Sequence, residues 1–235
     1  MVNSNTSCIK SVGGTKICAN CSNKIVKHGT TKAGKQRYKC KNCNKTVVAY
    51  YSYNACLPEI NSRIILYIKE GLGIRSIARI LKIATTTLLK RIIQIANMVV
   101  QPTIQNKKSY EVDELCTFIK QKSNRIWIVY ALDKETKEVV SFSVGNRTNL
   151  TLKKVINTLF DYAPKVIYTD KLRNYKSLIS SAIHKTTRFG TNHIERKNLT
   201  LRTHLKRLNR KTICFSRKEL FLEAILKIYF WSCSI

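Results

Sequence analysis

Two pairs of cysteines near the start of the chain constrain its folding more than any other feature. Cys18 and Cys21 form one C-x2-C pair, and Cys40 and Cys43 form a second pair after 18 intervening residues. A two-residue gap lets both thiolates of a pair face one ion, and four thiolates complete the tetrahedral shell that Zn²⁺ prefers. Because so short a segment buries little apolar surface, the metal supplies much of its folding energy. The spacing therefore predicts a zinc ribbon with a structural Zn²⁺.

The net charge is the second strong constraint. The chain has 43 Lys and Arg against 13 Asp and Glu, a formal net charge of +30. A charge this one-sided destabilises a compact chain unless a polyanion shares its field, so nucleic acid is the natural partner. No apolar run reaches the roughly 18 residues of a membrane span, and the N-terminus lacks the apolar stretch of a signal peptide. We expect an intracellular protein, in the cytoplasm and nucleoid, that binds DNA and no membrane.

Three amphipathic helices are expected after the cysteine cluster, and the last two have the form of a helix-turn-helix. Ile77 and Ala78 pack inward, and Ile83 fills the turn between the helices. An ordinary helical hairpin is the alternative, but the scarcity of acids in this stretch favours DNA binding. The residues expected to face DNA lie at the start of the last helix: Thr85, Thr86, Thr87, Lys90 and Arg91.

From residue 110 onward the hydrophobic pattern changes to one typical of strands. Three strands, a helix, a strand, a helix, a strand and further helices are expected in that order, and Ser216 and Glu219 are expected to cap the last helix. This order predicts an α/β domain, a mixed sheet with helices on both faces, compatible with a ribonuclease H-like fold. The predicted organisation is a leader (1–14), a zinc ribbon (15–50), a helix-turn-helix domain (57–100), a linker (101–109) and the α/β domain (110–235).

Three carboxylates stand out because acids are scarce. Asp113 lies in the first predicted strand, Asp170 ends a short buried strand, and Glu195 is the only acid between Asp170 and Glu219. Carboxylates from separate elements that meet at strand ends are what a Mg²⁺ site for phosphoryl transfer requires. The alternatives are a surface acid for Asp113, a helix cap for Asp170 and an arginine partner for Glu195. Arg202 lies two helical turns after Glu195, where it can hold a DNA phosphate.

Glu114 competes with Asp113 for the role of first carboxylate. Neighbours in a strand point to opposite faces, so only one of the two is expected to face the site. Glu111 shares the face of Asp113 and is a candidate supporting group. The residues alone leave the choice between Asp113 and Glu114 open.

The stretch from Asn192 to Lys211, with Phe215 and Ser216, resembles the transposases of the insertion sequence 1 family, as do the segments around Asp113 and Asp170. The resemblance extends over about residues 16–231. It implies a ribonuclease H-like fold with a DDE triad, in which 24 residues separate the second Asp from the Glu, the spacing of Asp170 and Glu195. It assigns Asp113 as the first carboxylate, and it matches Arg202 and His204 as further catalytic residues.

The resemblance also implies the activity. Such an enzyme binds the terminal inverted repeats of its element and, with two Mg²⁺ or Mn²⁺ ions, cleaves DNA and joins it to target DNA, as a homodimer or higher oligomer. A non-catalytic, sequence-specific DNA-binding regulator derived from a transposase is the first alternative. A ribonuclease or resolvase-like nuclease on the same fold is the second.

Overall fold

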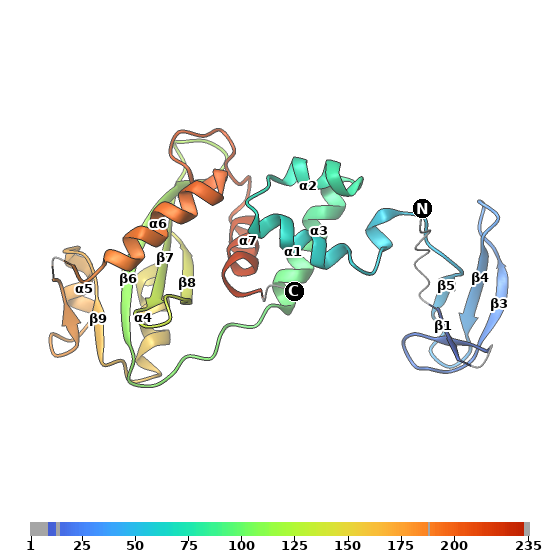
Figure 1. The fold of residues 1–235 in the computed structure, drawn as a ribbon, viewed down its shortest axis with the longest axis horizontal. Helices are drawn as coiled ribbons and strands as arrows, with labels where there is room; N and C mark the ends of the chain where they lie inside the picture. The colour runs from blue at the N-terminus through green and yellow to red at the C-terminus, as the bar shows by residue number, and fades with distance from the viewer. Residues whose placement is uncertain (1–8, 13–14, 188, 233–235) are drawn as a thin grey trace.

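The structure is a computed structural model that describes residues 9–12, 15–187 and 189–232. A small cysteine-bearing unit, a group of helices and a larger sheet follow one another along the long axis of the molecule (Figure 1). Of the predicted leader, residues 1–8 and 13–14 lie outside the described residues, whereas residues 9–12 form a strand. No helix in the described residues is both long enough and apolar enough to cross a membrane.

The N-terminal unit consists of two small antiparallel sheets. Strand β1 (Ile9–Val12) pairs with β2 (Thr15–Cys18), and a second sheet joins β3 (Ile25–Thr30), β4 (Gln36–Cys40) and β5 (Thr46–Val48). Because β2 ends on the first cysteine pair and β4 ends on the second, the strands bring the two pairs together. The buried core of this unit is Cys18, Ile25, Tyr38 and Cys40.

The helical unit follows a short 3-10 helix, η1 (Asn54–Cys56). It contains α1 (Ile60–Lys69), α2 (Ile74–Leu81) and α3 (Thr85–Met98). Lys82 adopts a left-handed conformation at the end of α2, and the Ile83 N–H donates to the Ala78 carbonyl at 3.0 Å. This tight turn buries Ile83 between α2 and α3, as the sequence predicted.

The larger sheet has five strands in the order β10-β9-β6-β7-β8. Strands β6 (Ser109–Phe118), β7 (Arg125–Asp133) and β8 (Val139–Gly145) are antiparallel. Strands β9 (Val166–Tyr168) and β10 (His184–Lys185) run parallel to β6. Three antiparallel strands extended by two parallel ones are the arrangement of a ribonuclease H-like fold, so the predicted fold class is confirmed.

Helices cover both faces of this sheet (Figure 1). Helices α4 (Asn149–Phe160) and α5 (Arg173–Leu178) pack against one face, and α6 (Asn192–His204), η2 (Lys206–Leu208) and α7 (Glu219–Trp231) against the other. Successive side chains of β7 point to opposite faces of the sheet. Val129 and Ala131 therefore pack in the core under α4 and α5, whereas Ile128 and Tyr130 pack in the core under α6 and α7.

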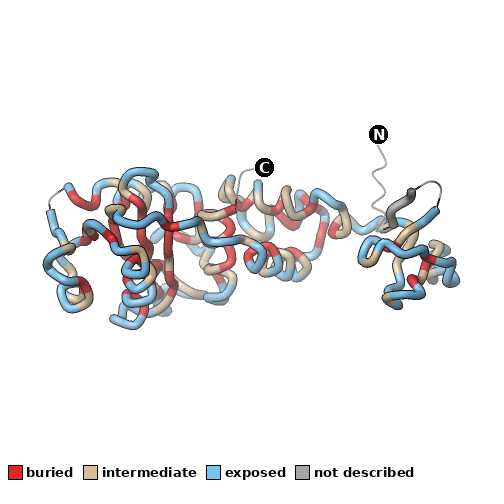
Figure 2. The backbone as a smooth tube through the Cα atoms, turned by 90° about the horizontal axis from the view of Figure 1, so that it is seen from below, coloured by how far each residue is buried: buried red, intermediate tan, exposed pale blue. Residues whose placement is uncertain are grey.

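Helix α7 belongs to two cores at once. Its residues Leu222 and Leu226 pack in the core on one face of the sheet, whereas Ala224, Ile225 and Ile228 pack with α1, α2 and α3. Figure 2 shows buried residues on both sides of this junction between the helical unit and the sheet. The two units therefore share a helix.

The predicted cap of α7 is wrong. The helix begins at Glu219 after Lys218, and no side-chain hydrogen bond caps it. Ser216 instead pairs with Ile119 of the β6–β7 turn, where its carbonyl accepts a hydrogen bond from the Lys120 N–H at 2.9 Å. This pairing holds Ser216 away from the start of the helix.

Candidate active site and metal centre

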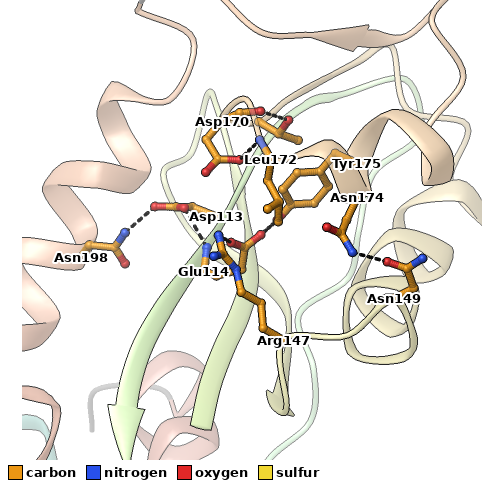
Figure 3. Close-up of polar contacts among 10 residues, drawn as sticks. Asp113, Glu114, Arg147, Asn149, Asp170, Leu172, Asn174, Tyr175 and Asn198 are labelled. Atoms are coloured by element: carbon orange, nitrogen blue, oxygen red, sulfur yellow. Dashed lines mark hydrogen bonds and ion pairs between the residues drawn. The ribbon is translucent and has the colours of Figure 1, made fainter. Parts of the chain in front are cut away.

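Three carboxylates meet where β9 ends beside β6. Glu111 of β6 pairs with Tyr168, the last residue of β9, so continuing this parallel register by two places brings Asp170 opposite Asp113. Ligand oxygens of Asp113, Glu114 and Asp170 all lie within 4.8 Å of one another. Figure 3 shows the three side chains converging.

The convergence of Asp113 and Glu114 differs from the sequence prediction that only one of them faces the site. Asp113 bonds to α6 on one face of the sheet, and Glu114 bonds to Tyr175 of α5 on the other. Because β9 has ended at this level, no strand separates the two faces beside β6. Both side chains therefore reach the same opening from opposite sides.

Each carboxylate is held by defined donors (Figure 3). The Glu114 N–H donates to Asp113 Oδ1 at 2.8 Å, and the Arg147 Nη2 donates to Glu114 Oε2 at 3.0 Å. The Leu172 N–H donates to Asp170 Oδ1 at 2.9 Å. Asp170 therefore does accept a backbone bond just before α5, as the helix-cap alternative expects, while its carboxylate also faces Asp113 and Glu114.

Asn198 of α6 holds the other oxygen of Asp113. Its Nδ2 donates to Asp113 Oδ2 at 2.6 Å, and its Oδ1 accepts a hydrogen bond from the Tyr130 hydroxyl at 2.8 Å. Because Tyr130 is fully buried in β7, this second bond fixes which end of the amide faces the carboxylate. Sequence reasoning missed Asn198, although its position three residues after Glu195 on one helix was a usable signal.

The electrostatics of this site oppose ionisation. Burial is the main cause that raises the pKa of Asp113 to about 6, and the neighbouring charges of Glu114 and Asp170 add to it. The hydrogen bonds from the Glu114 N–H and Asn198 act in the opposite direction. Burial also raises the pKa of Glu114 despite its bonds from Tyr175 and Arg147. A site with clustered, desolvated carboxylates is suited to a cation, because a bound cation relieves this repulsion.

The three other predicted catalytic residues lie on α6, outside this carboxylate group. Glu195 is exposed and accepts a hydrogen bond from the Thr191 hydroxyl at 3.0 Å. At about 100° per residue, Glu195, Asn198 and Arg202 share one side of the helix. The Arg202 Nη1 donates to the Leu208 carbonyl at 3.3 Å. Burial and the charge of Arg210 lower the pKa of Arg202, whereas the charge of Asp113 acts to raise it.

His204 is directed away from the carboxylates. It lies nine residues after Glu195, which places it about 180° around the helix. Its Nδ1 lies 2.8 Å from the Tyr229 hydroxyl of α7. The structure therefore brings Arg202 but not His204 to the face of α6 that carries Glu195.

Glu111 fixes α6 against β6. This fully buried carboxylate accepts a hydrogen bond from the Ile194 N–H at 2.9 Å, and the His193 Nδ1 lies 2.8 Å from its other oxygen. The Lys134 Nζ lies 3.4 Å away. Glu111 thus ties the start of the helix that carries Glu195 to the strand that carries Asp113.

The four cysteines of the N-terminal unit form a second cluster. Their sulfurs lie within 4.8 Å of one another, with 3.7 Å between Cys18 and Cys43 and 3.4 Å between Cys21 and Cys40. A tetrahedral shell with Zn–S bonds near 2.3 Å places its sulfurs about 3.8 Å apart. The Asn23 N–H is the main group that lowers the pKa of Cys21 to about 6, which favours the thiolate, whereas burial and the neighbouring cysteines raise the pKa of Cys43 to about 11. The cluster therefore indicates a structural zinc site.

The predicted DNA-facing residues of α3 divide into two groups. Thr85, Thr86 and Lys90 are exposed, whereas the Arg91 Nη2 donates to the Ala55 carbonyl at 2.7 Å and joins α3 to η1. Thr87 is half-buried, and its hydroxyl oxygen lies 3.4 Å from the hydroxyl oxygen of Tyr53. Sequence reasoning missed three cations that line a concavity with Thr85: Arg75, Arg79 and Lys82.

The chain is similar to known transposition proteins. A family model described as IS1 transposase matches residues 108–231. The insertion element iso-IS1n protein InsB of Shigella dysenteriae is 35% identical over 116 residues, which is 49% of this chain and 88% of that protein. The insertion element IS1 2 protein InsB of Escherichia coli (strain K12) is 36% identical over 107 residues, which is 46% of this chain and 64% of that protein.

A solved structure also aligns with the chain. A chain from a simian T-cell lymphotropic virus intasome in complex with PP2A regulatory subunit B56 gamma aligns with a TM-score of 0.37 and 16% identity, covering 69% of this chain and 66% of that one. The family match extends over more than half of the 235 residues and includes the whole five-stranded sheet, α6 and α7. The chain belongs to the IS1 transposase family.

Proposed function

We propose that this protein is a DNA transposase that binds the terminal inverted repeats of its element and catalyses DNA cleavage and strand transfer. The observation that carries the proposal is the approach of Asp113 and Asp170 at the end of β9, within one group of ligand oxygens. Family membership supports the same chemistry. We also propose the predicted domain boundaries, with residues 110–235 as the catalytic domain, except that residues 9–12 join the N-terminal unit through their pairing with β2.

The site residues fit a divalent ion. Carboxylate oxygens are the ligands that Mg²⁺ and Mn²⁺ prefer. Burial, together with the charges of Glu114 and Asp170, raises the pKa of Asp113, and a bound cation would offset this cost. Asp113 and Asp170 would hold the ions, and Glu195 would complete the set from α6. A bound pair of such ions supplies Lewis acidity at the attacking and leaving oxygens of an in-line displacement.

The other residues around the site position these groups. Asn198, oriented by Tyr130, holds the Asp113 carboxylate, and Glu111 holds the start of α6. Arg202, on the same side of α6 as Glu195, would hold a phosphate of the bound strand. Thr85, Thr86 and Lys90 of α3 would contact the element end, together with Arg75, Arg79 and Lys82.

Substitution of the second carboxylate tests the proposal. We expect Asp170→Ala to lose cleavage and strand transfer by at least about 10³-fold, because phosphoryl transfer at such a site depends on bound ions. Binding of the terminal repeat, measured by gel shift, is expected to stay unchanged. Full retention of strand transfer would refute the proposal and would favour the DNA-binding regulator.

Two glutamate variants then test which residue completes the carboxylate set. We expect Glu195→Gln to abolish strand transfer as Asp170→Ala does. Glu114→Gln is expected to keep measurable activity, because Arg147 and Tyr175 already occupy both of its oxygens. The reverse order of activities would assign the third position to Glu114.

A further inference from the structure

A basic concavity lies at the tip of the β6–β7 hairpin, beside the start of α7. Four cations line it: Lys120 and Arg125 from the hairpin, and Arg217 and Lys218 from the segment before α7. Its volume is about 410 Å³, and Glu219 is the one acid in its lining. We refer to these four residues as the basic concavity. It is separate from both the carboxylate site and the surface of α3.

The two sides of the basic concavity are fastened to each other. Ile119 and Ser216 form a parallel bridge, and the aromatic rings of Phe118 and Phe215 pack edge to face with centroids 5.2 Å apart. The Arg207 Nη1 donates to the Ser216 hydroxyl at 3.0 Å. Cations that lie more than 90 positions apart in the sequence are therefore held on one surface before any ligand binds.

These cations have no acidic partners in the part of the chain that the structure describes. The ion pairs found there join Lys108 to Glu135, Arg147 to Glu114, and Lys134 and His193 to Glu111. All four side chains of the basic concavity are exposed. Grouped, unpaired Lys and Arg side chains attract a polyanion, and phosphate oxygens are their usual partners on DNA.

The position of the basic concavity relates it to the carboxylate site. Strand β6 runs from Asp113 to Phe118, a separation of about 17 Å for five residues at 3.3 Å each, and Arg125 pairs with Phe118 at this end. Duplex DNA rises about 3.4 Å per base pair, so a duplex running along this direction would place its backbone at the basic concavity at least about five base pairs from the reacting phosphate. This minimum is less than one helical turn.

The chemistry favours a partner without a fixed sequence. Lys120 comes from the β6–β7 turn, Arg125 is the first residue of β7, and Arg217 and Lys218 come from the irregular segment just before α7. All four are long, exposed cations suited to phosphate oxygens. Phosphate contacts position DNA but carry no sequence information directly. We propose that the basic concavity binds the backbone of the target DNA duplex during strand transfer. This proposal rests on the proposed transposase function.

A triple variant tests the proposal: Arg125→Gln, Arg217→Gln and Lys218→Gln in the full chain. The first measurement is binding of a duplex without terminal repeats over a range of salt concentrations. The slope of log affinity against log salt is expected to fall by about 2.7, or about 0.9 for each phosphate that is no longer neutralised. The second measurement is strand transfer of pre-cleaved element ends, which is expected to fall at least tenfold, with binding and cleavage of element ends unchanged.

A charge-matched variant provides the control: Lys137→Gln, Lys153→Gln and Lys165→Gln remove the same net charge from exposed positions elsewhere on this domain. Melting temperatures establish that both variants fold. An unchanged salt slope in the first variant, or an equal loss in the control, would overturn the proposal. Loss of end binding would overturn it as well, because the basic concavity would then serve the element ends.

The two measurements, duplex binding and strand transfer, distinguish a failure of this proposal from a failure of the proposed function. The salt slope for the duplex needs no catalysis, so it tests the basic concavity even if the protein proves inactive. Asp170→Ala in the same assays is expected to lose strand transfer and keep the full salt slope. A protein that transfers no strand yet shows the expected slope change would contradict the transposase function alone.

Discussion

At the scale of single residues, Asp113 combines a functional position with an energetic cost. It is largely buried, it lies beside Glu114 and Asp170, and its pKa is raised from 3.8 to about 6. A carboxyl whose pKa is higher in the folded state than in the unfolded state lowers stability when it ionises. The cost is absent below pH 3.8, where Asp113 is protonated in both states, and it is complete above about pH 6.

The first prediction concerns this cost. Without added divalent ions, raising the pH from 4 to 7.5 is expected to shift the free energy of unfolding by about 1–3 kcal/mol in favour of Asp113→Asn relative to the parent protein, since one pKa unit corresponds to about 1.4 kcal/mol. Comparing pH values removes the constant cost of placing the variant's amide beside the donor amide of Asn198. Urea unfolding of both proteins at several pH values measures the shift. A difference between the two proteins that does not change with pH would contradict the raised pKa of Asp113.

The sequence predicted part of this site and missed the rest for physical reasons. The scarcity of acids and the end of a strand were enough to select Asp170, because both signals are local. The residues alone left Asp113 and Glu114 open, and only the family resemblance selected Asp113. Strand alternation then misled the choice at Glu114, since the rule assumes a continuous sheet and β9 ends at Tyr168. The spacing of Asn198 from Glu195 placed it on the correct side of α6. Its contact with Asp113, and its orientation by Tyr130 from 68 positions away, depend on tertiary packing.

At the scale of elements, the turn between α1 and α2 is fitted closely to the end of α6. Gly71 has a φ of +72°, and a Cβ atom built there would collide with the His204 carbonyl oxygen. A side chain at this position would meet both backbone strain and a collision with backbone. The turn that leads into the helix-turn-helix and the helix that carries Glu195 therefore touch at a glycine.

Substitution of this glycine gives the second prediction. Gly71→Ala is expected to lower the free energy of unfolding by about 2–4 kcal/mol, because left-handed backbone costs about 1–2 kcal/mol and the collision adds to it. Gly73→Ala, two residues later, is the matched control, since its Cβ would meet nothing within 4 Å. Gly73 is the N-cap of α2, where Ala is less favourable than Gly, so that control is expected to cost at most about 1 kcal/mol. Equal effects of the two changes in chemical denaturation would refute the close fit.

The order of elements followed from the sequence wherever local pattern decided it. The predicted series of three strands, a helix, a strand, a helix, a strand and further helices is the observed order from β6 to α7. The pattern failed where pairing between distant segments decides. Ser216 resembles a helix cap in sequence but bridges to Ile119, and residues 9–12 of the predicted leader pair with β2.

At the scale of the whole molecule, α7 joins the helical unit to the sheet. Ile225 and Leu226 are neighbours in sequence and both almost fully buried, yet Ile225 packs with α1, α2 and α3 and Leu226 packs on the sheet side. The units that we propose as the DNA-binding and catalytic domains therefore pack against opposite sides of one helix. A rigid shared element also holds α3 at a fixed place relative to the carboxylates.

This sharing yields the third prediction. Ile225→Ala and Leu226→Ala are each expected to cost about 2–5 kcal/mol, typical of a deleted buried side chain. If both units unfold together, each variant lowers the same single transition, whether followed by circular dichroism or by the near-ultraviolet signal of Trp127 and Trp231. Two separate transitions, with Ile225→Ala shifting only one, would show that α7 does not couple the units.

The position of α7 near the end of the chain also determines when the helical unit can finish folding during synthesis. Helices α1 to α3 leave the ribosome early, but residues 99–218 must follow before α7 can cover their apolar surface. At 5–20 residues per second this interval is about 6–24 s. During it the nascent protein carries an unfinished helical core, so it gains a complete DNA-binding unit only when the sheet and its carboxylates are also made. Premature release would leave a fragment with an uncovered apolar face, which chaperones and proteases recognise.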